Sequence, residues 1–212
     1  LETRMNTVSF VFQNSRLLKA SILENVRLGR PSATREEVLR ALDLAQCRDI
    51  LDKLPQGMDT VIGAGGTYLS GGEQQRIAIA RVILQDAPIV LMDEATAFAD
   101  PDNESKVQAA FANLAQGKTV VLKKGCAGCD VYTAEGVCHI PAFHIEEKDP
   151  TGCGDSFCAG FITGLVEGQC IRDAGTLANA AGALQAMYVG PMEGALYREE
   201  VDGFIRNHKA AK

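Results

Sequence analysis

The 212-residue sequence contains no apolar run that approaches the roughly 20 residues needed to cross a bilayer. Its first six residues have no apolar core, so no secretory signal is predicted there. It also lacks an excess of basic residues, since its formal net charge is −6. This charge argues against nucleic acid or an anionic membrane surface as the main partner. These features predict a cytoplasmic protein without direct membrane insertion.

The number of cysteines does not favour a disulfide framework. Seven cysteines are scattered through the chain, and an odd number suits a reducing compartment. Hydrophobic residues make up 46% and charged residues 23%, as in an ordinary soluble globular protein. The length is sufficient for one large domain or two small ones with a real core.

The first half of the chain alternates strand and helix patterns. Residues 7–12 alternate polar and apolar side chains and then become apolar, which predicts a strand. Thr34 and Glu37 have the spacing of a capping box, so a helix is expected behind them. Ser70 and Glu73 repeat this spacing before a helix expected to reach about residue 85. The other expected elements are a short helix at 48–54, a buried parallel strand at 89–92 and a helix through 107–114.

The second half begins at a short apolar run. Val120–Leu122 is bounded by glycines at 117 and 125, which favours a buried strand of a parallel sheet over a helix. Glu135-Gly136 separates two strand patterns and predicts a hairpin. The remaining expectations are strands at 130–133, 137–140 and 143–145, and helices at 154–167, 173–187 and 198–207. Alternating strands and helices predict the α/β class, with a mainly parallel sheet and flanking helices.

One group of candidate functional motifs lies in residues 69–94. Leu69–Arg76 reads Leu-Ser-Gly-Gly-Glu-Gln-Gln-Arg. Ser70 and the two glycines stand at an expected helix start, where free N–H groups and the positive end of the helix dipole suit a phosphate. Asp93 ends the expected strand as a candidate Mg²⁺ ligand, and Glu94 beside it is a candidate to polarise a water. Each motif alone fits a helix cap or a solvated strand end equally well, but their order and spacing favour the functional interpretation.

These motifs closely resemble the ATPase domain of ABC transporters over about residues 5–120. Leu69–Arg76 resembles the signature motif, Ile89–Glu94 the Walker B strand, Phe12-Gln13 the Q-loop and Ala95–Asp100 the D-loop. The resemblance implies ATP and Mg²⁺ as cofactors, and a second ABC-type chain or a membrane domain as partner. It also implies nucleotide contacts by Gln13, Ser70, Gly71 and Gly72, Mg²⁺ binding by Asp93, and a catalytic role for Glu94.

Two parts of that family pattern are missing from the sequence. No glycine-rich loop ending in Lys-Ser or Lys-Thr precedes the Q-loop residues. Lys123-Lys124-Gly125 stands where the switch histidine of the family is expected, and His139, His144 and His208 lie elsewhere. In this family the signature motif serves the ATP of a partner subunit. The chain is therefore not expected to complete an ATP site by itself.

A second group of motifs lies at Asp149–Phe157, which reads Asp-Pro-Thr-Gly-Cys-Gly-Asp-Ser-Phe. The backbone N–H groups of Gly152–Gly154 and the helix that they open suit an anion, and Asp155 is placed as a general base. The alternative is an ordinary loop and helix cap. The run resembles the C-terminal motif of ribokinase-like (PfkB) sugar kinases, and residues 119–212 fit the C-terminal half of that family.

This second resemblance implies that the glycines form an anion hole and that Asp155 removes the proton from a sugar hydroxyl. Cys153 stands where the family usually has a small alanine, and the backbone shape is expected to be unchanged. The sequence lacks the half of the family that carries the sugar-binding residues and the lid. The implied nucleotide-contacting residues are Gly125 and Gly128 in a glycine loop, Gly152, Cys153 and Gly154 in the anion hole, and Asn179 in the helix on the adenine side.

A Cys-x-x-Cys pattern at Cys126 and Cys129 is followed by Cys138-His139. A zinc site would need all four side chains to converge. Neighbours on a strand point to opposite faces, so Cys138 and His139 are poor co-ligands. A zinc site and a redox pair are both less favoured than ordinary residues of the glycine loop.

The sequence as a whole predicts a chimera. Residues 1–118 would form a truncated ABC ATPase fragment with a helical subdomain and the Walker B strand, and residues 119–212 a ribokinase-like nucleotide-binding half. The expected function is ATP (nucleotide) binding with little or no turnover by the chain alone. Two alternatives stay open. One is a carbohydrate kinase or ABC-type ATPase completed by a partner chain, and the other is a protein with no evolved function.

Overall fold

The computed structural model describes the chain apart from residues 1–6, 12–16, 64–65, 94–100, 195–196 and 209–212, and apart from the side chains of 101–103. The chain divides into two compact units, Leu1–Val120 and Val121–Lys212. Among the described residues, none of the helices is both long and apolar enough to cross a membrane.

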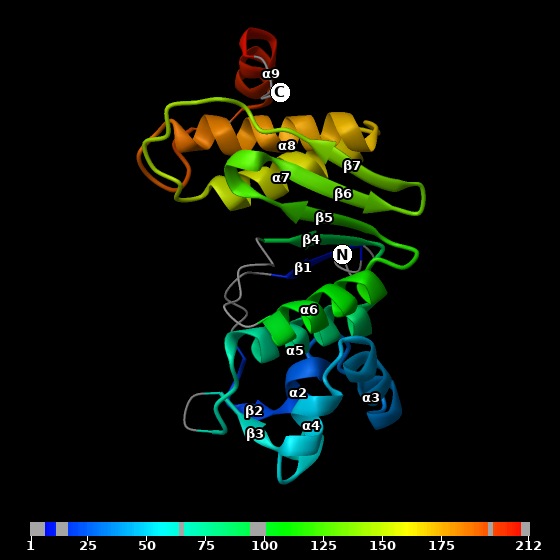
Figure 1. The fold of residues 1–212 in the computed structure, drawn as a ribbon. Helices are drawn as coiled ribbons and strands as arrows, with labels where there is room; N and C mark the ends of the chain where they lie inside the picture. The colour runs from blue at the N-terminus through cyan, green and yellow to red at the C-terminus, as the bar shows by residue number, and fades with distance from the viewer. Residues whose placement is uncertain (1–6, 12–16, 64–65, 94–100, 195–196, 209–212) are drawn as a thin grey trace. The chain divides into compact units, whose positions relative to one another are not determined.

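In the first unit, one helix lies at the centre of the others. The elements are β1 (Val8–Val11), β2 (Ala20–Ser21), α2 (Ile22–Arg27), α3 (Arg35–Leu44), α4 (Arg48–Lys53), η1 (Gly57–Asp59), β3 (Val61–Ile62), α5 (Gly71–Gln85), β4 (Ile89–Met92) and α6 (Pro101–Leu114). Helix α5 packs against α2, α3, α6 and β1 (Figure 1). Residues 75–80 of α5 are all buried, as expected of a helix that other elements surround.

The two predicted capping boxes are confirmed. Thr34 caps α3 by accepting a hydrogen bond from the N–H of Glu37, whose carboxylate accepts the N–H of Thr34. Ser70 and Glu73 form the same reciprocal pair at the start of α5. These caps satisfy backbone donors that the helix geometry leaves without partners, so they fix where each helix begins.

Strands β1 and β4 of the first unit are parallel, as the apolar run at 89–92 predicted, whereas the short strands β2 and β3 pair antiparallel. β1 pairs with β4 in the register Val8 with Ile89 through Val11 with Met92. The next strand in the order is β5 (Thr119–Lys123), at which the two units divide. Its first residue, Thr119, donates its N–H to the carbonyl of Pro88 at 3.0 Å.

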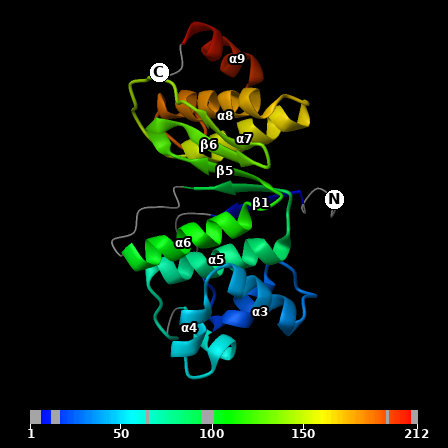
Figure 2. The same cartoon turned by 45° about the vertical axis from the view of Figure 1, so that its right-hand side comes forward.

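In the second unit, helices α7 and α8 cover a small group of strands (Figure 1). The strand order is β5, β6 (Cys129–Thr133) and β7 (Gly136–Ile140), and the 3₁₀ turn η2 (Gly125–Ala127) follows β5. The helices are α7 (Cys153–Val166), α8 (Ile171–Ala186) and α9 (Arg198–Asn207). The predicted hairpin is confirmed, because β6 and β7 pair antiparallel. Helix α8 lies between these strands and α9 (Figures 1 and 2).

One predicted strand is wrong. Residues 143–145 do not extend the sheet, and only Phe143 forms an isolated bridge. Phe143 is 7% exposed and packs edge-to-face on Phe204 of α9, with the ring centroids 5.3 Å apart. Leu177 and Leu184 of α8 belong to the same apolar cluster. The apolar pattern of this segment therefore reflects packing against helices rather than strand pairing. The predicted α/β class, with a mainly parallel sheet and flanking helices, is confirmed.

Candidate functional sites

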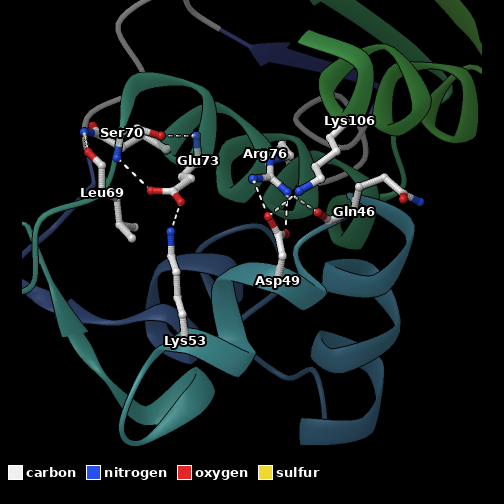
Figure 3. A network of polar contacts seen from close by, with 9 residues as sticks. Gln46, Asp49, Lys53, Leu69, Ser70, Glu73, Arg76 and Lys106 are labelled. Carbon is white, nitrogen blue, oxygen red and sulfur yellow. Dashed lines mark hydrogen bonds and ion pairs between the residues drawn. The ribbon is translucent and has the colours of Figure 1, made fainter. Parts of the chain in front are cut away.

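In the first unit, the start of α5 is held in one conformation. The Oγ of Ser70 accepts the N–H of Glu73 at 3.4 Å, and Ser70 donates its own N–H to Glu73 Oε2 at 2.8 Å (Figure 3). Leu69 is 3% exposed, and its carbonyl accepts the side-chain amide of Gln74 at 2.8 Å. The N–H groups of Gly71 and Gly72 lie in the first helical turn, outside the intrahelical ladder. The predicted signature residues thus share one capped helix start.

Glu73 joins this helix start to α4. Its side chain is 10% exposed and forms an ion pair with Lys53 (Figure 3). Burial raises the pKa of the Glu73 carboxyl, but Lys53 and the N–H of Ser70 lower that pKa by more, so it lies below its ordinary value. The carboxylate therefore stays charged and continues to hold the backbone of Ser70.

A second charged group lies one helical turn further along α5. The guanidinium of Arg76 is fully buried, and it contacts Asp49 of α4 and the carbonyl of Gln46 (Figure 3). Lys106 of α6 reaches the same carboxylate at 2.7 Å. Burial raises the pKa of Asp49, but the two cations outweigh it and lower the pKa to about 2. Asp49 and Lys106 were not singled out from the sequence; the one available signal was Arg76, a basic residue directly before the apolar run at 77–80.

Asp93 directly follows β4 at the carboxyl ends of two parallel strands. Its N–H donates to the carbonyl of Val11 at 2.9 Å, and the residue is partly buried. Ligands of open α/β sheets bind at this edge, so the position suits the predicted metal ligand. The other predicted residues of this site, Gln13, Glu94 and the segment 95–100, lie outside the described residues.

In the second unit, the start of α7 requires a glycine. Gly152 has φ +80°, and a Cβ there would lie 2.0 Å from the carbonyl oxygen of Pro191. Cys153 is the middle residue of the predicted anion hole. The N–H of Cys153 donates to the carbonyl of Pro150 at 3.2 Å, so it already has an acceptor. Asp155 lies exposed in the first turn of the same helix.

Two side chains clamp the loop before α7, and sequence reasoning assigned a role to neither. Asp149 accepts the N–H of Thr151 at 2.9 Å and the N–H of Gly190 at 3.0 Å. These hydrogen bonds hold the pKa of the Asp149 carboxyl below its ordinary value. Gln185 of α8 is fully buried, donates to the carbonyls of Thr151 and Gly190, and accepts the N–H of Gly194. A buried glutamine gives no pattern in the sequence by which this could be predicted.

Lys123 brings a positive charge beneath the start of α7. It is 8% exposed at the end of β5, and its Nζ lies 3.4 Å from the carbonyl of Gly154. The ammonium also lies 5.9 Å from the centroid of the Phe157 ring. Its charge adds to the positive end of the α7 dipole, so both favour an anion at this helix start.

Gly128 and Asn179 both lie against the backbone of Ile140 and Pro141, where they act as packing partners. Gly128 has φ +92°, and a Cβ there would lie 2.1 Å from the carbonyl oxygen of Ile140. Asn179 is 7% exposed and donates its side-chain amide to the carbonyls of Ile140 and Pro141 at 3.0 and 3.1 Å. Its nitrogen is therefore engaged within the protein, although a nucleotide role stays a prediction. Gly125, with φ +54°, opens the turn η2 between β5 and Gly128.

The cysteines near this loop lie in different environments. Cys126 is exposed, whereas Cys129 is buried, and burial raises the pKa of the Cys129 thiol to about 12. His139 contacts Asp130 instead, with Nδ1 and Oδ1 2.6 Å apart. Within the described part of the chain, no three His, Cys, Asp or Glu side chains gather as a metal site, and the seven cysteines are all free.

The fold and these sites define an α/β protein with two glycine-containing helix starts, one in each compact unit. By sequence, the chain belongs to the pfkB family of carbohydrate kinases, whose family model matches residues 89–196, slightly more than half of the chain. The ABC transporter family model matches residues 1–97. Both resemblances predicted from the motifs are confirmed. The pfkB match begins at residue 89, well before residue 119, and the two matches share residues 89–97.

The curated relatives resemble the first half of the chain. It is 44% identical over 117 residues to the β-(1→2)glucan export ATP-binding/permease protein NdvA of Agrobacterium vitis, covering 55% of this chain and 20% of that protein. It is 42% identical over 122 residues to the ATP-dependent lipid A-core flippase of Legionella pneumophila (strain Paris), covering 58% of this chain and 21% of that protein. For P-glycoprotein 14 of Caenorhabditis elegans the identity is 41% over 122 residues, covering 58% of this chain and 9% of that protein. The chain thus spans about a fifth or less of these relatives.

Proposed function

We propose that the 212-residue chain is a chimera of an ABC ATPase fragment and a PfkB-type half, and that it binds ATP with little or no turnover by itself. The observation that carries this proposal is the start of α7. Gly152 lets the backbone turn tightly there, and Lys123 places a buried cation beside the first turn. Glycines that admit an anion, together with a helix dipole and a cation, suit a nucleotide phosphate.

The clamp around this helix start supports the same proposal. Asp149 and Gln185 tie the loop at 149–152 to the segment at 190–194. A binding loop that is ordered before the ligand arrives loses less conformational entropy on binding. The exposure of Asp155 in the first turn supports a role toward a hydroxyl group rather than in holding the phosphate.

The expectation of low turnover rests on missing parts in the 212 residues. Phosphoryl transfer depends on positioning and on stabilising developing charge. The chain has no glycine-rich loop ending in Lys-Ser or Lys-Thr, and Lys123-Lys124-Gly125 stands where a switch histidine is expected. Asp93 would hold Mg²⁺, but it would not position the reacting phosphates.

A second candidate is an enzyme completed by another chain. Ser70, Gly71 and Gly72 form an ordered helix start of the kind that serves a partner's ATP in ABC proteins, and the relatives include ATP-binding/permease proteins. On this proposal the partner is a second ABC-type chain or a membrane domain, and the complex faces the cytoplasm. A carbohydrate kinase completed by a partner would use Asp155 as the base.

Calorimetry with ATP and Mg²⁺ tests the first proposal. We expect weak binding by the wild-type chain, no binding by Gly154→Val, and unchanged or slightly tighter binding by Asp155→Ala. The control is Gly203→Val, because Gly203 lies in α9 and a Cβ there would meet only an ordinary contact, with Arg206 Nη2 at 3.7 Å. No heat from the wild type would mean that the helix start holds no nucleotide. Loss of binding in Asp155→Ala alone would show that its assigned role is wrong.

A further inference from the structure

The second unit contains a cavity of about 490 Å³ among its three helices. One face of α7 contributes Asp155, Ala159 and Thr163, which follow each other at intervals of four residues. Leu177 of α8 and Val201 of α9 line it as well. Cavities of this size hold small molecules in many proteins.

Small residues of α7 and α8 line part of the cavity. Gly160 and Ala181 approach so closely that a Cβ on Gly160 would lie 3.2 Å from the Cβ of Ala181. Ala159 adds no more than a methyl group to the wall. At the edge of the cavity, Met192 and Tyr197 are 70% and 68% exposed. Exposed apolar surface beside a cavity is typical of a ligand-binding groove.

The described side chains that line the cavity carry two charges, those of Asp155 and Arg198. Arg198 lines the wall, but it is paired with both Glu167 and Asp202, the latter at 2.9 Å. One guanidinium therefore faces two carboxylates. Asp155 adds a further carboxylate, which forms no hydrogen bond or ion pair with the described side chains. Asp155 is exposed at the rim of the cavity, and a carboxylate there attracts a cation whose apolar body fits the walls.

We propose that this cavity binds a small organic amine. Its ammonium group would pair with Asp155, its apolar body would lie against Ala159, Ala181 and Val201, and Tyr197 would cover it. The site shares Asp155 with the predicted phosphoryl-transfer site, but its other walls come from later residues of α7, from α8 and α9, and from residues 191–192 and Tyr197. The proposal does not rest on nucleotide binding.

The test compares three probes of the same shape by calorimetry on the full chain, without nucleotide. Phenethylamine carries the cation, 2-phenylethanol is neutral, and 3-phenylpropionate is an anion. We expect the amine to bind at least about tenfold more tightly than the alcohol, which corresponds to about 1.4 kcal/mol, and the anion not to bind. Equal affinity for the amine and the alcohol would overturn the proposed ion pair.

Two variants with matched controls locate the binding. Asp155→Asn should remove the preference for the amine, whereas Glu135→Gln, in the hairpin turn outside the cavity, should keep it. Ala159→Leu should block the cavity and abolish binding, and Ala109→Leu, at an exposed position of α6, should not. Ala159 is exposed, so this change is compatible with folding, which circular dichroism would verify. Amine binding that survives Ala159→Leu would show that the amine does not bind in this cavity. ATP binding without amine binding would refute this inference alone.

Discussion

The carboxylate of Asp49 and the guanidinium of Arg76 face each other across α4 and α5 through two hydrogen bonds of 2.7 and 3.2 Å. The side chain of Arg76 is fully buried, whereas that of Asp49 is 40% exposed. The paired geometry fixes the relative orientation of the two planar groups. Because Ser70 lies at the start of the same helix, this pair also anchors the predicted phosphate-binding end of α5.

We predict that Asp49→Ala destabilises the first unit. Breaking a buried pair costs about 3–5 kcal/mol, because it leaves a buried charge uncompensated. Because Asp49 is partly exposed, we expect the free energy of unfolding to fall by about 3 kcal/mol or less, as measured by urea unfolding. The control is Asp43→Ala, which removes an exposed 3.4 Å pair with Arg48 and should cost about 0–1 kcal/mol. Equal losses in the two variants would contradict the prediction.

The same pair predicts a pH dependence of stability. The pKa of Asp49 is lowered from 3.8 to about 2 in the folded protein. The folded state therefore binds the proton less readily than the unfolded state, so the contribution of Asp49 is present above pH 3.8 and is lost as the pH falls toward 2. The difference in unfolding free energy between wild type and Asp49→Asn should shrink over this range. A difference that stays constant from pH 5 to pH 2 would show that Asp49 is not paired in solution.

We predict that the purified chain hydrolyses ATP no faster than an Asp93→Asn, Glu94→Gln double variant. The reason is the missing phosphate loop and switch histidine, since Mg²⁺ ligands alone do not position the reacting groups. Phosphate release over time, measured for both proteins at saturating ATP and Mg²⁺, checks this. A clear rate that the double variant loses would mean that the first unit completes an active site.

Gln185→Leu should loosen the loop before α7. The change removes hydrogen bonds to Thr151, Gly190 and Gly194, and buried groups left without partners cost about 1–3 kcal/mol. We expect a lower midpoint of thermal unfolding for the second unit and faster amide exchange at residues 150–153. Gln116→Leu, at an exposed position after α6, serves as the control. Unchanged exchange at the loop would contradict the clamp.

Local sequence patterns predicted most elements because short-range physics decides them. The capping box of Ser70 and Glu73 depends on a spacing of three residues, and the apolar run at 89–92 can be satisfied only by burial. The pattern at 143–145 was misread for the same reason. An apolar segment predicts burial, but Phe143 could bury its ring against strands or helices equally well, and its contact with Phe204 spans 61 residues of sequence.

The sequence by itself therefore determined the α/β class, the helix starts and the two family resemblances, because each depends on neighbouring residues and their spacing. Only the tertiary structure decided which distant groups meet. The pairing of Arg76 with Asp49, the clamp made by Gln185, and the cavity beside Asp155 join residues from separate helices or loops. Their partners are set by how the elements pack, and no local pattern records that packing.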